Sequence, residues 1–121
     1  MYDIRSGRLL KTFVGHKGSV QAVHLCDLQQ GSHLFSCSLD MSIKLWSLET
    51  DEHRPPELGP EEAVPMNSWP YPTAINDFQP VVLEDNLRLF AGCQDSITYM
   101  RSMAASALTA QVCVYVRART P

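Results

Sequence analysis

One pattern occurs twice in this chain, 44 residues apart, and it constrains the fold more than any other feature. Tyr2-Asp3 is followed by the short stretch Ile4–Gly7, and Trp46-Ser47 is followed in the same way by Leu48–Thr50. A fixed period of about 40 to 45 residues indicates a repeat protein, in which each unit buries its apolar face against the next unit. The chain is therefore expected to consist of repeated structural units.

Between these two points, short β-branched and apolar runs alternate with turn residues. The runs that we expect to form strands are Arg8–Val14, Ser19–Leu25, His33–Ser38 and Ser42–Trp46. The Gly and Asp residues between the runs suit tight hairpin turns. The region from Met1 to about Leu48 is therefore predicted to form short antiparallel strands.

Several spaced features of this region together resemble a WD repeat. They are Gly15-His16, Ser19-Val20 with Val23 and Leu25, the serine-rich run Leu34–Ser38, Asp40 in the turn that follows, and the closing Trp46-Ser47. The resemblance covers residues 2–47 and implies a β-propeller blade. Arg8–Val14 would be the outer strand of one blade, and residues 19–26, 33–38 and 42–47 would be the inner strands of the next.

The expected fold class is all-β. It is a partial WD-repeat β-propeller of one to two four-stranded antiparallel blades, with an acidic proline-rich loop and an irregular C-terminal tail. The blade of the clear repeat is expected to span residues 1–48.

The resemblance also implies a buried hydrogen-bond relay through Trp46, Ser36, His16 and Asp40. Their chemistry fits, because an indole only donates, a hydroxyl donates and accepts, and a neutral imidazole does one of each. A catalytic Ser-His-Asp triad is the alternative interpretation. However, Ser36 would lie in mid-strand with neither a nucleophile elbow nor an oxyanion hole. We therefore expect a structural relay and no catalytic residue.

No metal or cofactor site is predicted. The remaining histidines, His24, His33 and His53, show no ligand spacing with one another. We expect them to be packed or solvated side chains.

The composition changes abruptly in the second region, Glu49–Pro72. It holds six of the eight prolines and a cluster of acidic residues. Prolines remove backbone donors, and the acidic cluster has little apolar surface to bury. We predict an acidic, proline-rich loop or linker without regular strands. An insertion is favoured over a docking loop for a basic partner, because long surface loops cost little closure entropy.

A second, degenerate blade is predicted for residues 73–101. Leu89–Asp95 resembles the second strand and turn of a WD repeat, but Ala91 replaces the relay serine and Met100 stands near the tryptophan position. The Gly-His pair is absent, and the turn after the aspartate is expected to be one residue shorter. Residues 102–121 match nothing in the family, and we expect a weak helix or an unstructured tail there.

Charge and composition exclude several classes of function. Ten Lys and Arg face 13 Asp and Glu, a net charge of −3, whereas nucleic-acid binders usually carry a basic stripe. The charged start, Met1–Arg5, lacks the apolar segment of a secretory signal, and Met103–Val116 is too short for a membrane span. We expect no nucleic-acid or membrane partner and a cytoplasmic or nuclear location.

The cysteines support the same location. Cys26, Cys37, Cys93 and Cys113 are widely and irregularly spaced, with no C-x-x-C pair. We expect reduced, mostly buried thiols.

At family level the resemblance implies a scaffold or adaptor that presents loops and blade edges to partner proteins. Propellers close with about 4 to 8 blades, so this chain is expected to be a fragment or isoform of a larger propeller protein. The alternatives are a truncated product without autonomous function and a small complete β-domain. Uncovered blade faces are expected to favour self-association. The side chains that one sheet could not cover are Val20, Val23, Leu25, Phe35, Ile43, Leu45 and Trp46.

Overall fold

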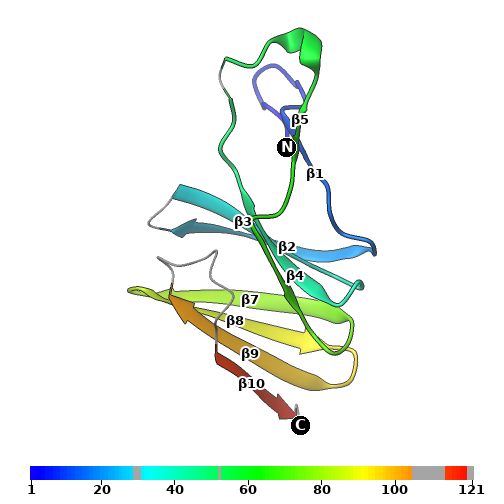
Figure 1. Ribbon diagram of the computed structural model, residues 1–121, viewed down its shortest axis with the longest axis vertical. Helices are drawn as coiled ribbons and strands as arrows, with labels where there is room; N and C mark the ends of the chain where they lie inside the picture. Colours follow the sequence, from blue (N-terminus) through cyan, green and yellow to red (C-terminus); the bar gives the residue numbers. More distant parts are fainter. Residues whose placement is uncertain (29–30, 52, 105–113, 120–121) are drawn as a thin grey trace.

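The computed structural model describes residues 1–28, 31–51, 53–104 and 114–119, and these form an all-β structure (Figure 1). Within these ranges the only helical element is a short 3-10 turn, η1 (Pro56–Leu58). No helix in the described part of the chain is long and apolar enough to cross a membrane. The predicted fold class of antiparallel four-stranded blades is confirmed.

The first four-stranded sheet has the strand order β2-β3-β4-β6. β2 (Val20–Leu28), β3 (Gly31–Ser38) and β4 (Ser42–Ser47) lie where the sequence predicted the three inner strands. β6 (Asn67–Pro70) completes the sheet antiparallel to β4. We call this sheet the first blade.

The second four-stranded sheet has the order β7-β8-β9-β10, again antiparallel throughout. Its strands are β7 (Ile75–Leu83), β8 (Asn86–Cys93), β9 (Ile97–Ala104) and β10 (Val114–Arg119). Figure 1 shows this second blade stacked on one side of the first, whereas β1 and β5 lie on the other side. A second blade was predicted, and the structure contains all four of its strands.

The inner strands of the two blades pair in the same register, and equivalent residues of the two blades are 55 positions apart in the sequence. Ser36 of β3 lies opposite Lys44 of β4, and Ala91 of β8 lies opposite Tyr99 of β9. A bulge interrupts β2 and β7 at equivalent places near their starts. Each residue of the first blade's inner strands therefore has a counterpart in the second blade.

The turns after β3 and β8 have the same length. Met41 and Ser96 hold equivalent positions in them, with positive φ angles of 70° and 62°. Each amide donates to the carbonyl oxygen three residues earlier. The prediction that the turn after Asp95 is one residue shorter is wrong.

Because the two blades share this register, the residue of the second blade that corresponds to Trp46 differs from the one that the sequence suggested. Leu34 pairs with Trp46 in the first blade, and Leu89 pairs with Arg101 in the second. Arg101, and not Met100, therefore occupies the tryptophan position.

The prediction that Glu49–Pro72 contains no regular strand is also wrong. Its last part is β6, whose Trp69 pairs with Ile43. β6 forms an edge of the sheet, where proline is tolerated because one side of the strand needs no ladder hydrogen bonds. Pro70 is accordingly the last residue of the strand.

A second short strand in this segment, β5 (Glu61–Ala63), pairs in parallel with β1 (Lys11–Phe13). Prolines flank β5 without interrupting it, at Pro60 and Pro65. The segment between β4 and β6 is thus an insertion within the first blade, not a linker between blades.

The expected irregular tail is partly strand. Ser102–Ala104 continue β9, and β10 pairs with β9 over six residues. The sequence of β10 begins Val-Tyr-Val, residue types that favour strands. The remainder of the predicted tail, 105–113 and 120–121, lies outside the described residues.

The main core lies between the two blades. Its largest fully buried contributors are Phe35, Ile43, Leu45 and Trp69 of the first blade and Ile75, Leu87, Leu89 and Tyr99 of the second blade. The expectation that Phe35, Ile43 and Leu45 would be uncovered is wrong, because the second blade covers them. Trp46 is buried as well, on the other side of the sheet.

Candidate protein-interaction surface

The first blade turns one face away from the second blade. Because side chains alternate across a strand, this face carries Val20, Val23 and Leu25 of β2, Leu34 and Ser36 of β3, and Lys44 and Trp46 of β4. We call this surface the open face. β1 and β5 lie on this side of the blade (Figure 1).

The structure brings the four predicted relay residues together beside the open face. Trp46 Nε1 donates to Ser36 Oγ over 2.8 Å, and Ser36 Oγ lies 2.6 Å from His16 Nε2. His16 Nδ1 lies 2.9 Å from Asp40 Oδ2. Because the indole donates to the hydroxyl, the hydroxyl proton can go to Nε2, which leaves Nδ1–H to donate to the carboxylate.

Asp40 is the acceptor at the end of this relay. It accepts hydrogen bonds from Ser42 Oγ at 2.6 Å, from the Ser42 amide at 3.1 Å and from the Lys17 amide at 3.0 Å, in addition to His16. Burial alone would raise the pKa of Asp40, but the hydrogen bonds from Ser42, His16 and Lys17 outweigh it and lower the pKa to about 2. The carboxylate is therefore charged at neutral pH and joins the loop before β2 to the turn after β3.

Close packing accompanies these hydrogen bonds. The ring of Phe13 meets Trp46 edge-on, with centroids 5.5 Å apart. A Cβ at Gly15 would come within 3.2 Å of Trp46 Cη2, and one at Gly18 would come within 2.9 Å of the Asp40 amide nitrogen. The two glycines therefore allow the loop to approach the blade.

A nucleophilic role for Ser36 is not supported by this geometry. Its side chain is buried, and its hydroxyl already bonds Trp46 and His16. A catalytic serine needs room for substrate beside its oxygen.

Different residues occupy the relay positions of the second blade. Adding 55 to each relay number leads from His16, Ser36, Asp40 and Trp46 to Tyr71, Ala91, Asp95 and Arg101. The aspartate is kept, and the other three are replaced.

Two of the replacements, Tyr71 and Arg101, form a cluster with Asp95 and Tyr99. Tyr99 donates its hydroxyl to Asp95 Oδ2 over 2.7 Å, and its ring lies 6.0 Å from that of Tyr71. The Arg101 guanidinium stacks over the Tyr71 ring at 4.8 Å and donates to the carbonyl oxygen of Pro70. Sequence reasoning missed this cluster, although the repeated spacing of 55 residues would have located three of its members.

Comparison with known families supports the WD-repeat interpretation of the first blade. Residues 7–47 match the family model described as WD domain, G-beta repeat. Residues 7–47 form a WD repeat. No curated protein matches it. The matched segment contains β1 to β4 and all four relay residues.

The open face of the first blade contains a pocket of about 310 Å³. Phe13, Val20, Leu34 and Trp46 supply apolar walls, and His16 and Ser36 supply polar atoms that already bond each other. Because the polar groups are satisfied, the pocket suits an apolar side chain.

Apolar side chains are also exposed around this pocket. Val20, Val23 and Leu25 of β2 are 51%, 55% and 74% exposed, and Val14 in the loop before β2 is also exposed. These three β2 residues remain uncovered, as the sequence predicted.

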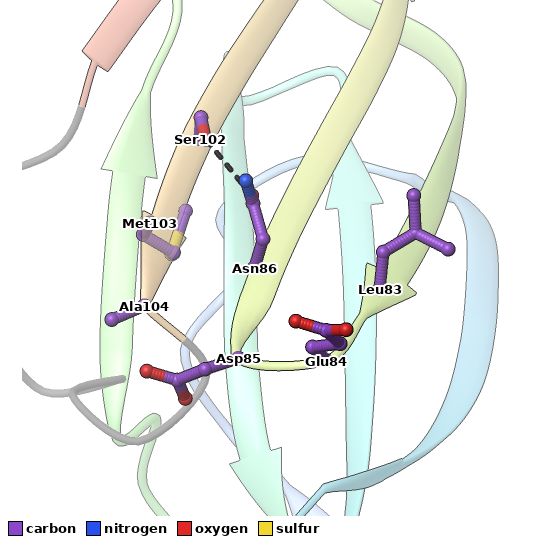
Figure 2. A pocket seen from close by; sticks show the side chains of 7 residues that line it. All are labelled: Leu83, Glu84, Asp85, Asn86, Ser102, Met103 and Ala104. Carbon is purple, nitrogen blue, oxygen red and sulfur yellow. Dashed lines mark hydrogen bonds between the residues drawn. The ribbon is translucent and has the colours of Figure 1, made fainter.

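A larger hollow of about 470 Å³ lies at the end of the second blade where β7 turns into β8 (Figure 2). It is lined by the β7–β8 turn, with Glu84 and Asp85, and by the end of β9. Ser102 donates to Asn86 Oδ1 over 3.0 Å, as the dashed line in Figure 2 marks.

The two carboxylates of this hollow, Glu84 and Asp85, do not make a metal site. Nowhere in the described ranges do three or more His, Cys, Asp or Glu side chains form a possible metal-binding group.

The remaining histidines lie apart. His24 meets Phe78 edge-on at 4.8 Å in the blade interface, His33 is buried with Nδ1 2.9 Å from the Gly31 carbonyl oxygen, and His53 is exposed.

Cys26, Cys37 and Cys93 are free thiols, and Cys113 lies outside the described residues. Burial raises the pKa of both Cys37 and Cys93 to about 11, so these two thiols are protonated at neutral pH.

Proposed function

We propose that this WD-repeat protein is a non-catalytic scaffold or adaptor that binds other proteins through the open face of its first blade. The observation that carries the proposal is the row of exposed apolar side chains Val20, Val23 and Leu25 beside an apolar pocket. Contiguous apolar surface of this kind marks interaction sites in soluble proteins.

The relay supports this role by holding the pocket in one conformation. Trp46 and Leu34 line the pocket, and hydrogen bonds to Ser36 and His16 hold the tryptophan ring and the neighbouring loop in place. A preformed pocket loses little conformational entropy when a partner's side chain enters it. An apolar anchor in such a pocket is a typical hot spot of a protein interface.

The chemistry of the described residues supports a non-catalytic role. The hydroxyl of Ser36 is engaged within the relay, and the thiols of Cys37 and Cys93 have a raised pKa. Each of these potential nucleophiles is kept in an unreactive state.

A photo-crosslinking amino acid placed at position 23 of the full chain tests the proposal. We expect it to capture specific proteins in cells, and we expect purified forms of those proteins to lose binding to the double variant Val23→Glu/Leu25→Glu. The matched control is Leu83→Glu, at a similarly exposed leucine, 65% exposed, at the end of β7 in the second blade. Loss of binding in the control with retention in the double variant would place the binding site elsewhere.

We further propose that the protein resides in the cytoplasm or nucleus and that these two blades belong to a longer propeller protein. The number of blades supports the second point, because propellers close with about 4 to 8 blades and the described residues form two. In the longer protein a neighbouring blade would cover the open face, so the binding proposed above belongs to this chain as a separate isoform. Immunoblotting and microscopy of the endogenous protein test both points. We expect a product above 13.6 kDa with the 13.6 kDa isoform beside it, and a cytosolic or nuclear signal. A 13.6 kDa product that binds no protein would favour the alternative, a product without autonomous function.

A further inference from the structure

The insertion between β4 and β6 contacts a strand that the WD repeat assigns to another blade. β1 occupies the position of the outer strand of the blade that precedes the first blade. Residues 53–66, which we call the strap, reach β1 through β5 (Figure 1). They then return to the first blade, where the amide of Met66 donates to the carbonyl oxygen of Leu45 over 2.7 Å. The strap is therefore inserted in one blade and pairs with a strand of its neighbour.

β5 lies on one edge of β1, and Met1 lies on the other. Lys11 bonds Met1 through both of its backbone groups: its carbonyl oxygen accepts from the Met1 amino group over 2.8 Å, and its amide donates to the Met1 carbonyl oxygen over 3.3 Å. On the opposite edge, the carbonyl oxygen of Leu10 accepts from the Glu61 amide over 2.9 Å. β5 therefore holds the edge of β1 that faces away from Met1.

The Met1 edge is the one on which an outer strand meets its own blade. Tyr2, beside Met1, matches Trp46 in the repeat of 44 residues. Trp46 lies in β4, which pairs with β6, the outer strand of the first blade. Among the described residues β6 is the last strand of its sheet, whereas β1 carries β5 beyond it. β5 is therefore an extra strand, added to the outer edge of the neighbouring blade.

We propose that the strap ties the first blade to the outer strand of the preceding blade and so holds the two blades together. Without the strap, β1 is connected to the first blade by the loop that leads into β2 and by side-chain contacts. With the strap, β1 moves away only when its hydrogen bonds to β5 break as well. The proposal does not depend on what the open face binds, and only its application to a preceding blade rests on the longer propeller proposed above.

A buried lysine anchors β1 at the place where the insertion leaves the first blade. The side chain of Lys11 is only 4% exposed. Its Nζ donates to the carbonyl oxygen of Ser47, at the end of β4, over 3.1 Å and to that of Glu49 over 2.6 Å. Burying an ammonium group is costly unless it makes its hydrogen bonds. Lys11 therefore has to stay beside these two carbonyl groups.

The strap itself is held in shape by local contacts. Arg54 Nε donates to the carbonyl oxygen of Gly59 over 3.0 Å, and its Nη2 donates to that of Leu58 over 3.4 Å, which closes the turn around η1. After β5 the strap passes the loop before β2, where a Cβ on Gly15 would come within 3.3 Å of Pro65 Cδ. Prolines and a closed turn restrict the free segment, so little entropy is lost when the strap pairs with β1.

The outer edge of β5 does not suit a strand added by a partner protein. The Glu61 amide and the Ala63 carbonyl oxygen bond β1, so the backbone groups of Glu62 between them point outward. Pro60 and Pro65 flank the strand without amide hydrogens to continue the ladder. Prolines at an edge prevent further pairing. This favours a strap over a docking strand.

Hydrogen–deuterium exchange of the full chain tests the strap with the matched variants Glu61→Pro and Glu62→Pro. Each removes one carboxylate and one amide, but only the Glu61 amide donates to β1. We expect Glu61→Pro to speed exchange of the Val14 amide, which donates to Ala63, about fivefold or more, as loss of a hydrogen bond does. Glu62→Pro should leave it unchanged, and β8 should exchange at the wild-type rate in both. Equal exchange of Val14 in the two variants would overturn the proposal.

A second pair of variants tests the anchor and decides the question if Glu61→Pro unfolds the chain. Lys11→Met should speed exchange throughout β1 and β5 about tenfold, because hydrogen bonds from a charged group are lost. Lys44→Met is the control, since Lys44 Nζ donates to Ser68 Oγ over 2.9 Å within the first blade. It should leave β1 and β5 unchanged. Equal effects of the two lysine variants on β1 would contradict an anchor at Lys11.

The strap and the longer propeller can fail separately. If Glu61→Pro and Glu62→Pro act alike, the strap is wrong even when immunoblotting finds the longer protein. If the variants differ but only a 13.6 kDa product exists, the strap holds β1 within this chain and the link to a preceding blade is wrong.

Discussion

Asp40 links more separate parts of the first blade than any other described side chain of the relay. It bonds the side chain of His16, the amide of Lys17 and both the amide and the hydroxyl of Ser42. A single carboxylate therefore joins the loop before β2 to the turn that leads into β4. At the residue scale, this is where a small change is expected to have a large effect.

We expect Asp40→Ala to lower the free energy of unfolding by about 1 to 3 kcal/mol, because it leaves buried donors without an acceptor. Urea unfolding of the wild type and the variant measures the difference. Asp51→Ala is the matched control, since Asp51 is exposed and accepts from the exposed His53 amide. We expect a smaller effect there. An Asp40→Ala protein with unchanged stability but lost partner binding would show that the relay is a binding site instead.

The lowered pKa of Asp40 makes its contribution to stability depend on pH. Its pKa is 3.8 in the unfolded reference and about 2 in the folded protein. The folded state therefore binds the proton less tightly, so the contribution is complete above pH 3.8 and is lost as the pH falls through about 2. We expect the stability difference between wild type and Asp40→Asn to shrink over this range. A difference that stays constant from pH 6 to about pH 2 would contradict the assignment.

At the element scale, β6 shows how a strand can form in an unfavourable sequence. It lies just after a proline-rich, acidic insertion, yet Trp69 is buried and stacks on Phe35 with 25° between the ring planes. Pairing with β4 gives the strand its hydrogen bonds, and the blade interface gives it an apolar environment. Its tertiary contacts outweigh the local composition.

We expect Trp69→Ala to lower the free energy of unfolding by about 3 to 5 kcal/mol, as removal of a buried aromatic side chain does. Trp69→Phe should cost less than Trp69→Ala, because it keeps an aromatic ring and leaves a smaller cavity. The indole nitrogen of Trp69 has no hydrogen-bond partner among the described residues, so removing it adds little to the loss of unfolding free energy. Chemical denaturation measures both variants. Equal, near-zero effects would mean that β6 is a loop after all.

At the scale of the whole molecule, the two blades share one core. Buried side chains from both sheets form a single cluster, and His24 of the first blade packs against Phe78 of the second. Neither blade covers its own inner face. The structure therefore behaves as one folding unit along this interface, while Val20, Val23 and Leu25 on the open face stay exposed.

Leu89→Ala tests this shared core. Leu89 lies in β8 and is fully buried in the cluster. We expect a loss of about 2 to 5 kcal/mol, together with faster amide exchange in β3 and β8 alike, measured by hydrogen–deuterium exchange. Leu25→Ala, at an exposed position on the first blade, serves as the control and should change little. Faster exchange confined to the second blade would show that the blades unfold separately.

The sequence by itself determined the WD repeat, the three inner strands of the first blade and the four relay residues. These features depend on local alternation and on fixed spacings between His16, Ser36, Asp40 and Trp46, which are visible in one repeat. The degenerate second blade was also visible in Leu89–Asp95, although its register was misjudged by one residue.

Only the tertiary structure decided which segments complete the two sheets. β6 and β10 join their blades through pairing with β4 and β9, and β5 pairs with β1 across a long sequence separation. Hydrogen bonds between distant strands carry little local signal, so acidic and proline-rich composition dominated the prediction for the segment that contains β5 and β6. The burial of Phe35 and the exposure of Val23 were likewise settled by where the second blade packs. Both residues are apolar and lie in adjacent strands of the first blade, and only the neighbouring sheet distinguishes one face from the other.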